Sequence, residues 1–258
     1  MKWAFEGKFT NDNVKDGELP DGWSKKMVKD ISFVNPKLPF ENINENTEVS
    51  FLPMKLVEEI INKINLNEFK KFKEVKKGVT PMTDGDVIFA KITPCIENGK
   101  IAVVHSLRNK IGFGSTEFHV FRCKVGYFNL YLFHYLIQER TRQEAKRNMT
   151  GAVGQRRVPK KFLEEVKIPI PPTLPEQHRI VSEIETRLSV CDKLEESITQ
   201  SLEKAEALRQ SILKKAFEGK LVPQDPSDEP ASVMLARIRA EREKNKPVIK
   251  TRNKKDRG

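Results

Sequence analysis

The chain has 258 residues, enough for one large domain or two modest ones. Hydrophobic residues make up 38% of it and charged residues 32%, which is typical of a soluble globular protein. No apolar run approaches the roughly 20 residues that span a bilayer, and the N-terminal residues lack the apolar core of a secretory signal. We therefore expect a cytoplasmic protein without a membrane partner.

The formal net charge of +11 favours a polyanionic partner such as nucleic acid. Part of the excess lies in the C-terminal tail from Lys244 on, but residues 70–110 are also rich in lysine. The cysteines and histidines are isolated from one another along the chain, so we expect no disulfide framework, no metal site and no cofactor. They are Cys95, Cys123, Cys191, His105, His119, His134 and His178.

A five-residue repeat occurs near the two ends of the sequence. Residues 4–8 and 216–220 both read Ala-Phe-Glu-Gly-Lys. The second copy ends a long helical pattern, with Gly219 at the position of a left-handed helix cap, whereas no helical pattern precedes the first copy. We therefore expect this chain to be one unit of a protein normally built from two, with residues 1–18 supplying the end of a preceding helix and a linker.

A mixed α/β domain is predicted for residues 19–172, within an α+β fold. Asn98-Gly99 is a strong turn signal, and the apolar runs on either side of it indicate short buried strands. A further run alternates polar and apolar residues, as in a half-buried strand. The predicted strands span 87–90, 101–104 and 117–122, and the predicted helices span 57–64 and 127–147.

Two loops of this domain carry candidate DNA contacts. One surrounds the Asn98-Gly99 turn, and the other, residues 148–157, contains two glycines and ends in two arginines. Arginine pairs bidentately with guanine, and asparagine or glutamine with adenine. The alternative for each residue is a solvated surface charge, or a phosphate contact without sequence preference. The candidates are Lys91, Thr93, Asn98, Lys100, Gln155, Arg156 and Arg157.

A long helix is predicted for residues 173–219. Thr173-Leu174-Pro175-Glu176 fits a capping box with proline in the first turn, and neither glycine nor proline follows until Gly219. Apolar residues recur in heptads along the helix, which is roughly 65 Å long. The seam consists of Ile184, Leu188, Cys191, Leu194, Ile198, Leu202, Ala205, Leu208 and Ile212, with Ala216 beyond it. One interpretation is packing on the chain's own domain; we favour pairing with a second similar helix.

Residues 220–258 contain several prolines and then a short helical pattern with Val233, Leu235 and Ile238 on its apolar side. The basic segment from Lys244 on has a composition typical of disorder.

Several motifs resemble those of one protein family. Residues 168–181, Ile-Pro-Ile-Pro-Pro-Thr-Leu-Pro-Glu-Gln-His-Arg-Ile-Val, resemble a signature of the specificity subunits of type I restriction–modification systems. Residues 209–222 look like the end of that family's spacer helix, and Leu19-Pro20-Asp21-Gly22-Trp23 looks like the start of its target recognition domain. Residues 85–88 and 150–155 are similar to looser internal motifs of that domain.

The resemblance implies a subunit with two target recognition domains separated by two antiparallel helices, in which each domain reads one half of a split DNA sequence. It implies no catalytic residues. Modification subunits that methylate adenine and a restriction subunit that cleaves DNA would be recruited instead. This chain has only one recognition domain and one helix, so we expect a half-length form that binds double-stranded DNA and forms a homodimer through the long helix.

Two other functions remain as alternatives. A self-contained DNA endonuclease would need acidic residues such as Asp84 and Asp86 beside Glu74-Val75-Lys76, but acids flanking Gly85 are more typical of a turn. A helical scaffold that does not read DNA would leave the basic residues of the globular part unexplained. Phosphate-loop, dinucleotide-binding, zinc-protease and adenine-methyltransferase motifs are absent from the sequence, so we do not expect an enzyme.

Overall fold

The computed structural model describes residues 2–9, 14–15, 17–39, 41–152, 154–223 and 225–245. The chain divides into two compact units, Met1–Cys191 and Asp192–Gly258. The helices are α1 (Lys2–Phe5), α2 (Val28–Ile31), α3 (Asn129–Leu136), α4 (Glu139–Arg147), α5 (Lys160–Glu165), α6 (Leu174–Phe217) and α7 (Ala231–Lys244), with short 3-10 turns at Met54–Leu56, Phe72–Glu74 and Arg108–Lys110. The strands are β1 (Ser24–Met27), β2 (Ser32–Val34), β3 (Glu48–Leu52), β4 (Phe69–Lys71), β5 (Thr80–Thr83), β6 (Val87–Ala90), β7 (Ile101–Val103), β8 (Ile111–Gly114), β9 (Phe118–Cys123) and β10 (Lys167–Ile170). The predicted α+β fold with a long helix after a mixed domain is confirmed.

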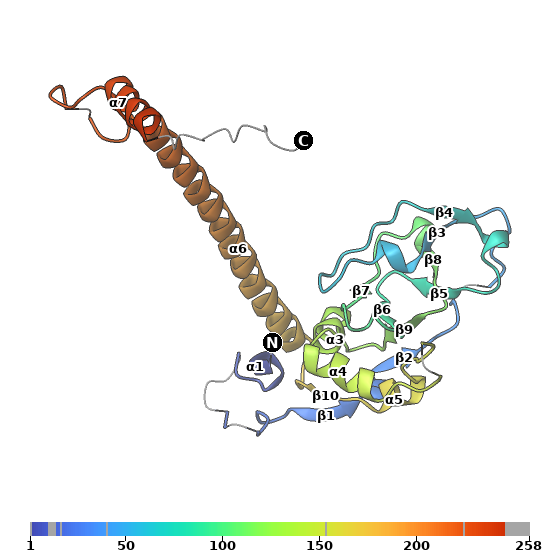
Figure 1. The fold of residues 1–258 in the computed structure, drawn as a ribbon. Helices are drawn as coiled ribbons and strands as arrows, with labels where there is room; N and C mark the ends of the chain where they lie inside the picture. The colour runs from blue at the N-terminus through green and yellow to red at the C-terminus, as the bar shows by residue number, and fades with distance from the viewer. Residues whose placement is uncertain are drawn as a thin grey trace, which may run out of the picture. The chain divides into compact units, whose positions relative to one another are not determined.

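The strands of the first unit form three small sheets (Figure 1). The central sheet has the order β2-β9-β6-β7 and is antiparallel throughout. A second sheet has the order β4-β3-β8-β5, in which β3 and β8 run parallel. The third pairs β1 with β10, so that the start of the domain lies beside its last strand. The strands predicted at 87–90 and 101–104 are confirmed as β6 and β7.

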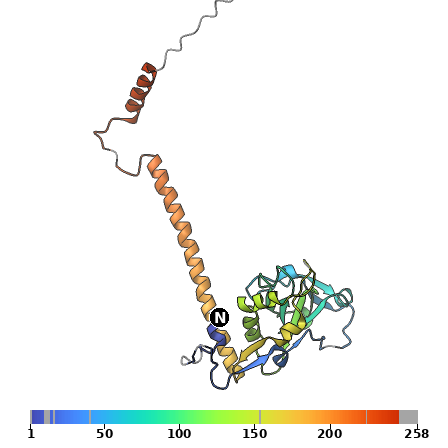
Figure 2. The ribbon, with the colours of Figure 1, turned by 60° about the horizontal axis from the view of Figure 1, so that its bottom comes forward.

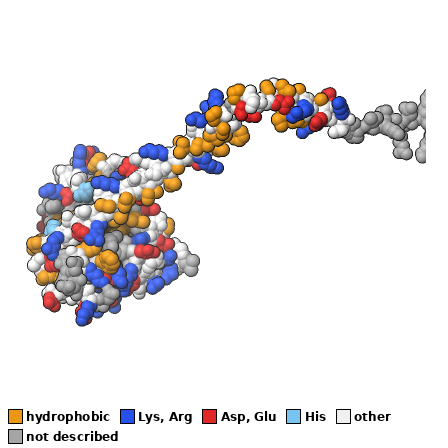
Figure 3. Space-filling view, turned by 90° about the vertical axis from the view of Figure 1, so that its left-hand side faces the viewer, with side chains coloured by type: hydrophobic (Ala, Val, Ile, Leu, Met, Phe, Trp, Pro, Cys, Tyr) orange, Lys and Arg blue, Asp and Glu red, His pale blue; other side chains and the backbone are white. Residues whose placement is uncertain are grey.

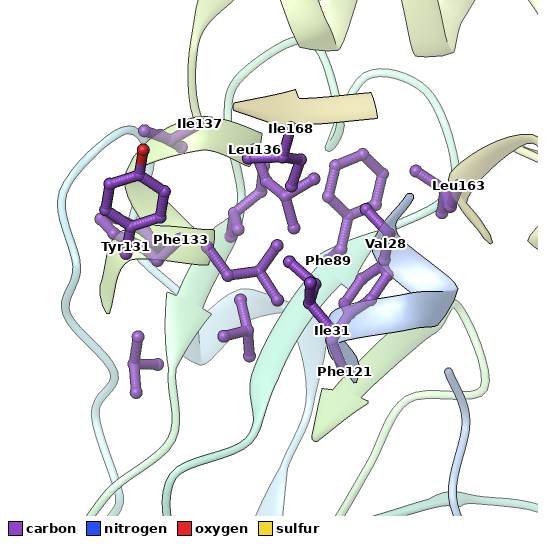
Figure 4. Packing of buried hydrophobic residues seen from close by; sticks show 14 of the residues in the cluster. Val28, Ile31, Phe89, Phe121, Tyr131, Phe133, Leu136, Ile137, Leu163 and Ile168 are labelled. Atoms are coloured by element: carbon purple, nitrogen blue, oxygen red, sulfur yellow. The ribbon is translucent and has the colours of Figure 1, made fainter. Parts of the chain in front are cut away.

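The central sheet is buried on both faces. Val87, Phe89 and Phe121 point into a cluster with α2, α3 and β10, where the rings of Phe89 and Phe121 lie 6.3 Å apart (Figure 4). Ile88 and Val120 point the other way, into a cluster with residues of the second sheet. The prediction that the strand at 117–122 is half-buried was therefore wrong, because a second layer covers the face that would otherwise meet water.

Two predicted helices differ from the structure. Residues 127–147 form two helices, α3 and α4, and the break between them is stabilised by side chains: Thr141 Oγ1 donates to the carbonyl of Tyr135, and Arg142 Nε to that of Ile137. Residues 57–64 form no helix. Val57 and Ile64 pair instead as an antiparallel bridge, and a turn with Ile60 in the left-handed region (φ 68°) joins them.

Helix α6 is continuous over 44 residues (Figure 1 and Figure 2). Thr173 Oγ1 accepts a hydrogen bond from the Glu176 amide at 3.3 Å, as the capping box predicts. The carboxylate of Glu176 accepts a hydrogen bond from Trp23 Nε1 at 3.2 Å, which ties the helix start to the domain.

The first turns of α6 belong to the domain core. Gln177, Ile180, Val181 and Ile184 are buried there. Ile184 therefore does not belong to a free seam, contrary to the prediction, because it packs in the core of the first unit. Beyond it the apolar positions lie open, and Figure 3 shows hydrophobic side chains along the helix. The exposed seam consists of Leu188, Cys191, Leu194, Ile198, Leu202, Ala205, Leu208 and Ile212.

None of the helices among the described residues combines the length and the apolar character that a bilayer-spanning segment requires. The tail from residue 246 on, for which disorder is predicted, lies outside the described residues.

Candidate nucleic-acid interface

The fold brings parts of the two predicted loops together. The amide of Val158 donates to the carbonyl of Lys91 at 2.9 Å, and Ile92 pairs with Arg157 as an antiparallel bridge. Thr150 and Arg157 exchange two backbone hydrogen bonds, which close the glycine loop into a narrow hairpin. We call Lys91, Thr93, Gln155, Arg156 and Arg157 the basic loop cluster. Lys91 is partly exposed, and the other four are exposed.

Glycine is required at the base of this hairpin. Gly151 has φ 116°, and a Cβ at this position would lie 2.8 Å from the carbonyl oxygen of Gln155. The Gln155 amide in turn donates to the carbonyl of Ala152 at 2.9 Å. The Arg156 guanidinium donates to the carbonyl of Met149, so the loop is compact and its arginine stems are held at defined places.

Arg157 forms an ion pair with Glu117, the residue immediately before β9. Its Nε and Nη2 donate to both carboxylate oxygens at distances from 2.8 to 3.2 Å. The pair lowers the pKa of the Glu117 carboxyl and raises the pKa of the Arg157 guanidinium. Because both side chains reach solvent, phosphate oxygens can replace the carboxylate as the acceptor. Glu117 thus fixes the orientation of the Arg157 guanidinium.

His119 anchors the cluster from inside the domain. Its Nδ1 accepts a hydrogen bond from the side-chain Nδ2 of Asn35 at 3.0 Å, which leaves Nε2 to donate to the carbonyl of Val158 at 2.9 Å. Burial lowers the pKa of His119, and the positive charges of Lys91 and Lys160 lower it further. The imidazole is therefore neutral at pH 7 and serves as a fixed link between β9 and the loop.

The side chains of Asn98 and Lys100 form hydrogen bonds with residues 54–59. Asn98 Nδ2 donates to the carboxylate of Glu59 at 2.8 Å, and Lys100 Nζ donates to the carbonyls of Val57 and Met54 at 2.9 and 3.3 Å. These bonds hold the 54–59 segment against the Asn98-Gly99 turn. The charge of Lys160 at the start of α5 acts on His119, as that of Lys91 does, and Lys160 forms an ion pair with Glu164 at 3.2 Å.

The acids considered for a nuclease have structural partners. Asp86 is buried and forms a bidentate ion pair with Arg122 at 2.7 and 2.8 Å, and it also accepts a hydrogen bond from the Thr83 amide. Asp84 accepts a hydrogen bond from the Leu107 amide. Nowhere in the described part of the chain do three His, Cys, Asp or Glu side chains gather closely enough to hold a metal ion. These partners agree with the interpretation of Asp84 and Asp86 as turn residues.

The fold is similar to that of solved subunits of type I restriction–modification systems. A solved HsdS subunit from Thermoanaerobacter tengcongensis superimposes with a TM-score of 0.63 at 22% identity, over 83% of this chain and 53% of that one. A second structure, from a study of complex assembly and conformational transition of the type I R-M system, gives a TM-score of 0.56 at 19% identity, over 85% and 52% of the two chains.

Sequence comparison identifies the family. The model of the type I restriction modification DNA specificity domain matches residues 20–204. The chain is 36% identical to the EcoAI specificity subunit and 34% identical to the EcoEI specificity subunit, both from Escherichia coli, over 90% of its own length and 46% of theirs. It belongs to the type I restriction–modification DNA specificity family, and spans about half the length of these relatives. The predicted resemblance to this family is confirmed.

Proposed function

We propose that this chain reads one half of a two-part DNA sequence through the basic loop cluster. The observation that carries the proposal is the meeting of Lys91 with the Gln155–Arg157 hairpin at one place, where the fold supplies several exposed cations and an amide. The arginines and lysines would contact phosphates or guanines, and Gln155 would contact adenine. Because a hairpin tip is narrow, the major groove has room for it.

The exposed seam of α6 supports pairing with a second copy of the chain. A two-fold axis near residue 200 would place Leu188 opposite Ile212, and Ile198 opposite Leu202, of the antiparallel copy. Two recognition domains related by such an axis read identical half-sites in inverted orientation, so the target would be an interrupted palindrome.

The chain would act as the specificity component of a larger complex with modification and restriction subunits. Exposed Val233, Met234 and Leu235 on α7 offer an apolar surface for one of these partners. Deletion of residues 224–258 should weaken the binding of a modification subunit without unfolding the recognition domain. Unchanged binding in a pull-down would exclude α7 as a docking element.

Selection from randomised duplex DNA, with and without a modification subunit, tests the proposal directly. The bound fraction should converge on two inverted copies of one short sequence with a constant spacer. Two unrelated halves would contradict the symmetric dimer but not DNA recognition. A bound fraction as random as the input would favour a scaffold that does not read DNA.

A further inference from the structure

The two copies of Ala-Phe-Glu-Gly-Lys have the same local structure. In each, a helix ends in a glycine with positive φ, 77° at Gly7 and 68° at Gly219. Three backbone hydrogen bonds close the helix end in each copy, and they join corresponding residues. They are Glu6 to Lys2, Gly7 to Ala4 and Lys8 to Trp3 at 3.2, 3.4 and 3.0 Å, and Glu218 to Lys214, Gly219 to Ala216 and Lys220 to Lys215 at 3.0, 3.0 and 2.7 Å. Even the ion pair between the glutamate and the following lysine recurs.

The surroundings of the two copies differ. Phe5 is 4% exposed, whereas its counterpart Phe217 is 90% exposed. The Phe5 ring lies between two tyrosines of α3, with its centroid 5.0 Å from that of Tyr131 and 5.1 Å from that of Tyr135. Both contacts are edge-to-face, the geometry that aromatic pairs prefer. One copy therefore has a binding surface and the other, identical in shape, has none among the described residues.

The surface that holds Phe5 is rigid. The hydroxyl of Tyr131 donates to the carbonyl of Pro169 at 2.8 Å, and that of Tyr135 to the carbonyl of Lys167 at 2.8 Å, so β10 fixes both rings. Gly7 lies so close to Pro20 that a Cβ at this position would overlap the proline ring. We call Tyr131, Tyr135 and Pro20 the Phe5 seat. The resident segment contacts this seat through Phe5 and, two residues later, through Gly7, and both copies have a phenylalanine and a glycine at this spacing.

We propose that the helix end at residues 214–221 binds the Phe5 seat of a second copy of this chain, where Phe217 takes the place that Phe5 takes within its own domain. The local structures already match, so binding requires no rearrangement of the incoming segment. The chain's own residues 2–9 are tethered to the seat by a short linker and compete at a high effective concentration. Exchange between copies should therefore become visible when the resident phenylalanine is removed. The inference does not depend on the exposed seam or on DNA binding.

The first test exploits how little the two segments differ. Between residues 2–9 and 214–221 only two positions are unlike: Trp3 corresponds to Lys215, and Phe9 to Leu221. Trp3→Lys with Phe9→Leu in the full chain therefore puts the second segment into the seat. We expect this variant to fold. Its melting temperature should fall by less than half as much as that of Phe5→Ala, because the phenylalanine and the glycine are retained. A loss as large as that of Phe5→Ala, or failure to fold, would overturn the proposal.

The second test measures binding between molecules. A fluorescein-labelled peptide of residues 208–222 is titrated with the full chain, in its natural form and as Phe5→Ala, and anisotropy is followed. The peptide should bind Phe5→Ala at least about tenfold more tightly than the natural chain, and a matched peptide with Phe217→Ala should lose at least about tenfold in affinity. Equal binding of the two peptides to Phe5→Ala would mean that Leu208 and Ile212, and not Phe217, account for the binding, and would overturn the proposal. If Phe5→Ala does not fold, the first test is decided by whether the chain with Trp3→Lys and Phe9→Leu folds.

Discussion

The exposed seam of α6 makes the strongest quantitative prediction. Its leucine and isoleucine side chains are between 42% and 67% exposed. Covering each one removes about half of its area from water, which is worth about 1 kcal/mol. Two copies of the six such residues contribute about 12 kcal/mol, against an association cost of about 4–15 kcal/mol. A dimer formed through this seam would therefore be close to its limit of stability, and one unfavourable substitution should dissociate it.

Ile198→Asp is that substitution. Ile198 is near the middle of the seam, and the dimer would bury two unpaired carboxylates, each costing several kcal/mol. Size-exclusion chromatography with light scattering at about 10–100 μM should give a dimer for the natural chain and a monomer for the variant. Ser197→Asp is the matched control, because it adds the same charge one residue away, on an exposed position outside the seam. A monomer for the natural chain, or a dimer for Ile198→Asp, would refute the reasoning.

Three further predictions concern the recognition domain. Arg156→Ala with Arg157→Ala should weaken DNA binding and reduce the salt dependence of the affinity. The slope of log affinity against log salt concentration, measured by anisotropy over a salt series, should fall by about one unit for each phosphate that is no longer neutralised. An unchanged slope in a folded protein would mean that the hairpin does not contact DNA. Asp86→Ala should lower the free energy of unfolding by about 3 kcal/mol, because it leaves Arg122 and the Thr83 amide without their acceptor, whereas Asp84→Ala should cost less than half as much in urea denaturation. Burial lowers the pKa of His134 from 6.5 to about 4, so the unfolded state takes up a proton first as the pH falls and stability is lost between these values, by up to about 3 kcal/mol. His134→Leu should flatten this part of the pH profile, and a parallel profile would mean that other groups dominate it.

Local sequence signals predicted the elements that depend on local structure. Strands β6 and β7 follow from apolar runs around a turn, and α6 follows from a capping threonine and an uninterrupted heptad pattern. The break between α3 and α4 could not be predicted, because the side chains of Thr141 and Arg142 replace helical hydrogen bonds there and the sequence pattern continues across it. Similarly, Val57 and Ile64 have the spacing of one helix face, yet they pair as an antiparallel bridge. Both side chains are buried in that arrangement too, so the apolar pattern does not distinguish it from a helix.

The candidate site was predictable only in part. The glycines and arginines of residues 151–157 indicated a basic loop, but its contact with Lys91 depends on β9 and on the link from His119 to Val158, which no local pattern reveals. Asn98 and Lys100 have the chemistry of DNA contacts, yet the fold gives their polar groups intramolecular partners. Ile184 fits the heptad as well as Leu188 does. Only the packing of α6 on the domain distinguishes the covered position from the open one.

The burial of Ile184 and the exposure of Leu188 constrain the rotation of the helix about its own axis. Gln177 is clamped by hydrogen bonds to the backbone of Phe128 and Gly126, so the start of α6 cannot turn relative to the domain. Each residue of a helix advances the side-chain direction by about 100° and the axis by about 1.5 Å. Insertion or deletion of one residue between positions 184 and 188 would turn the Leu188 side chain by about 100° about the helix axis relative to Ile184. The four-residue spacing thus keeps both side chains on one side of α6, so the side that packs into the core at Ile184 is the side that is exposed at Leu188.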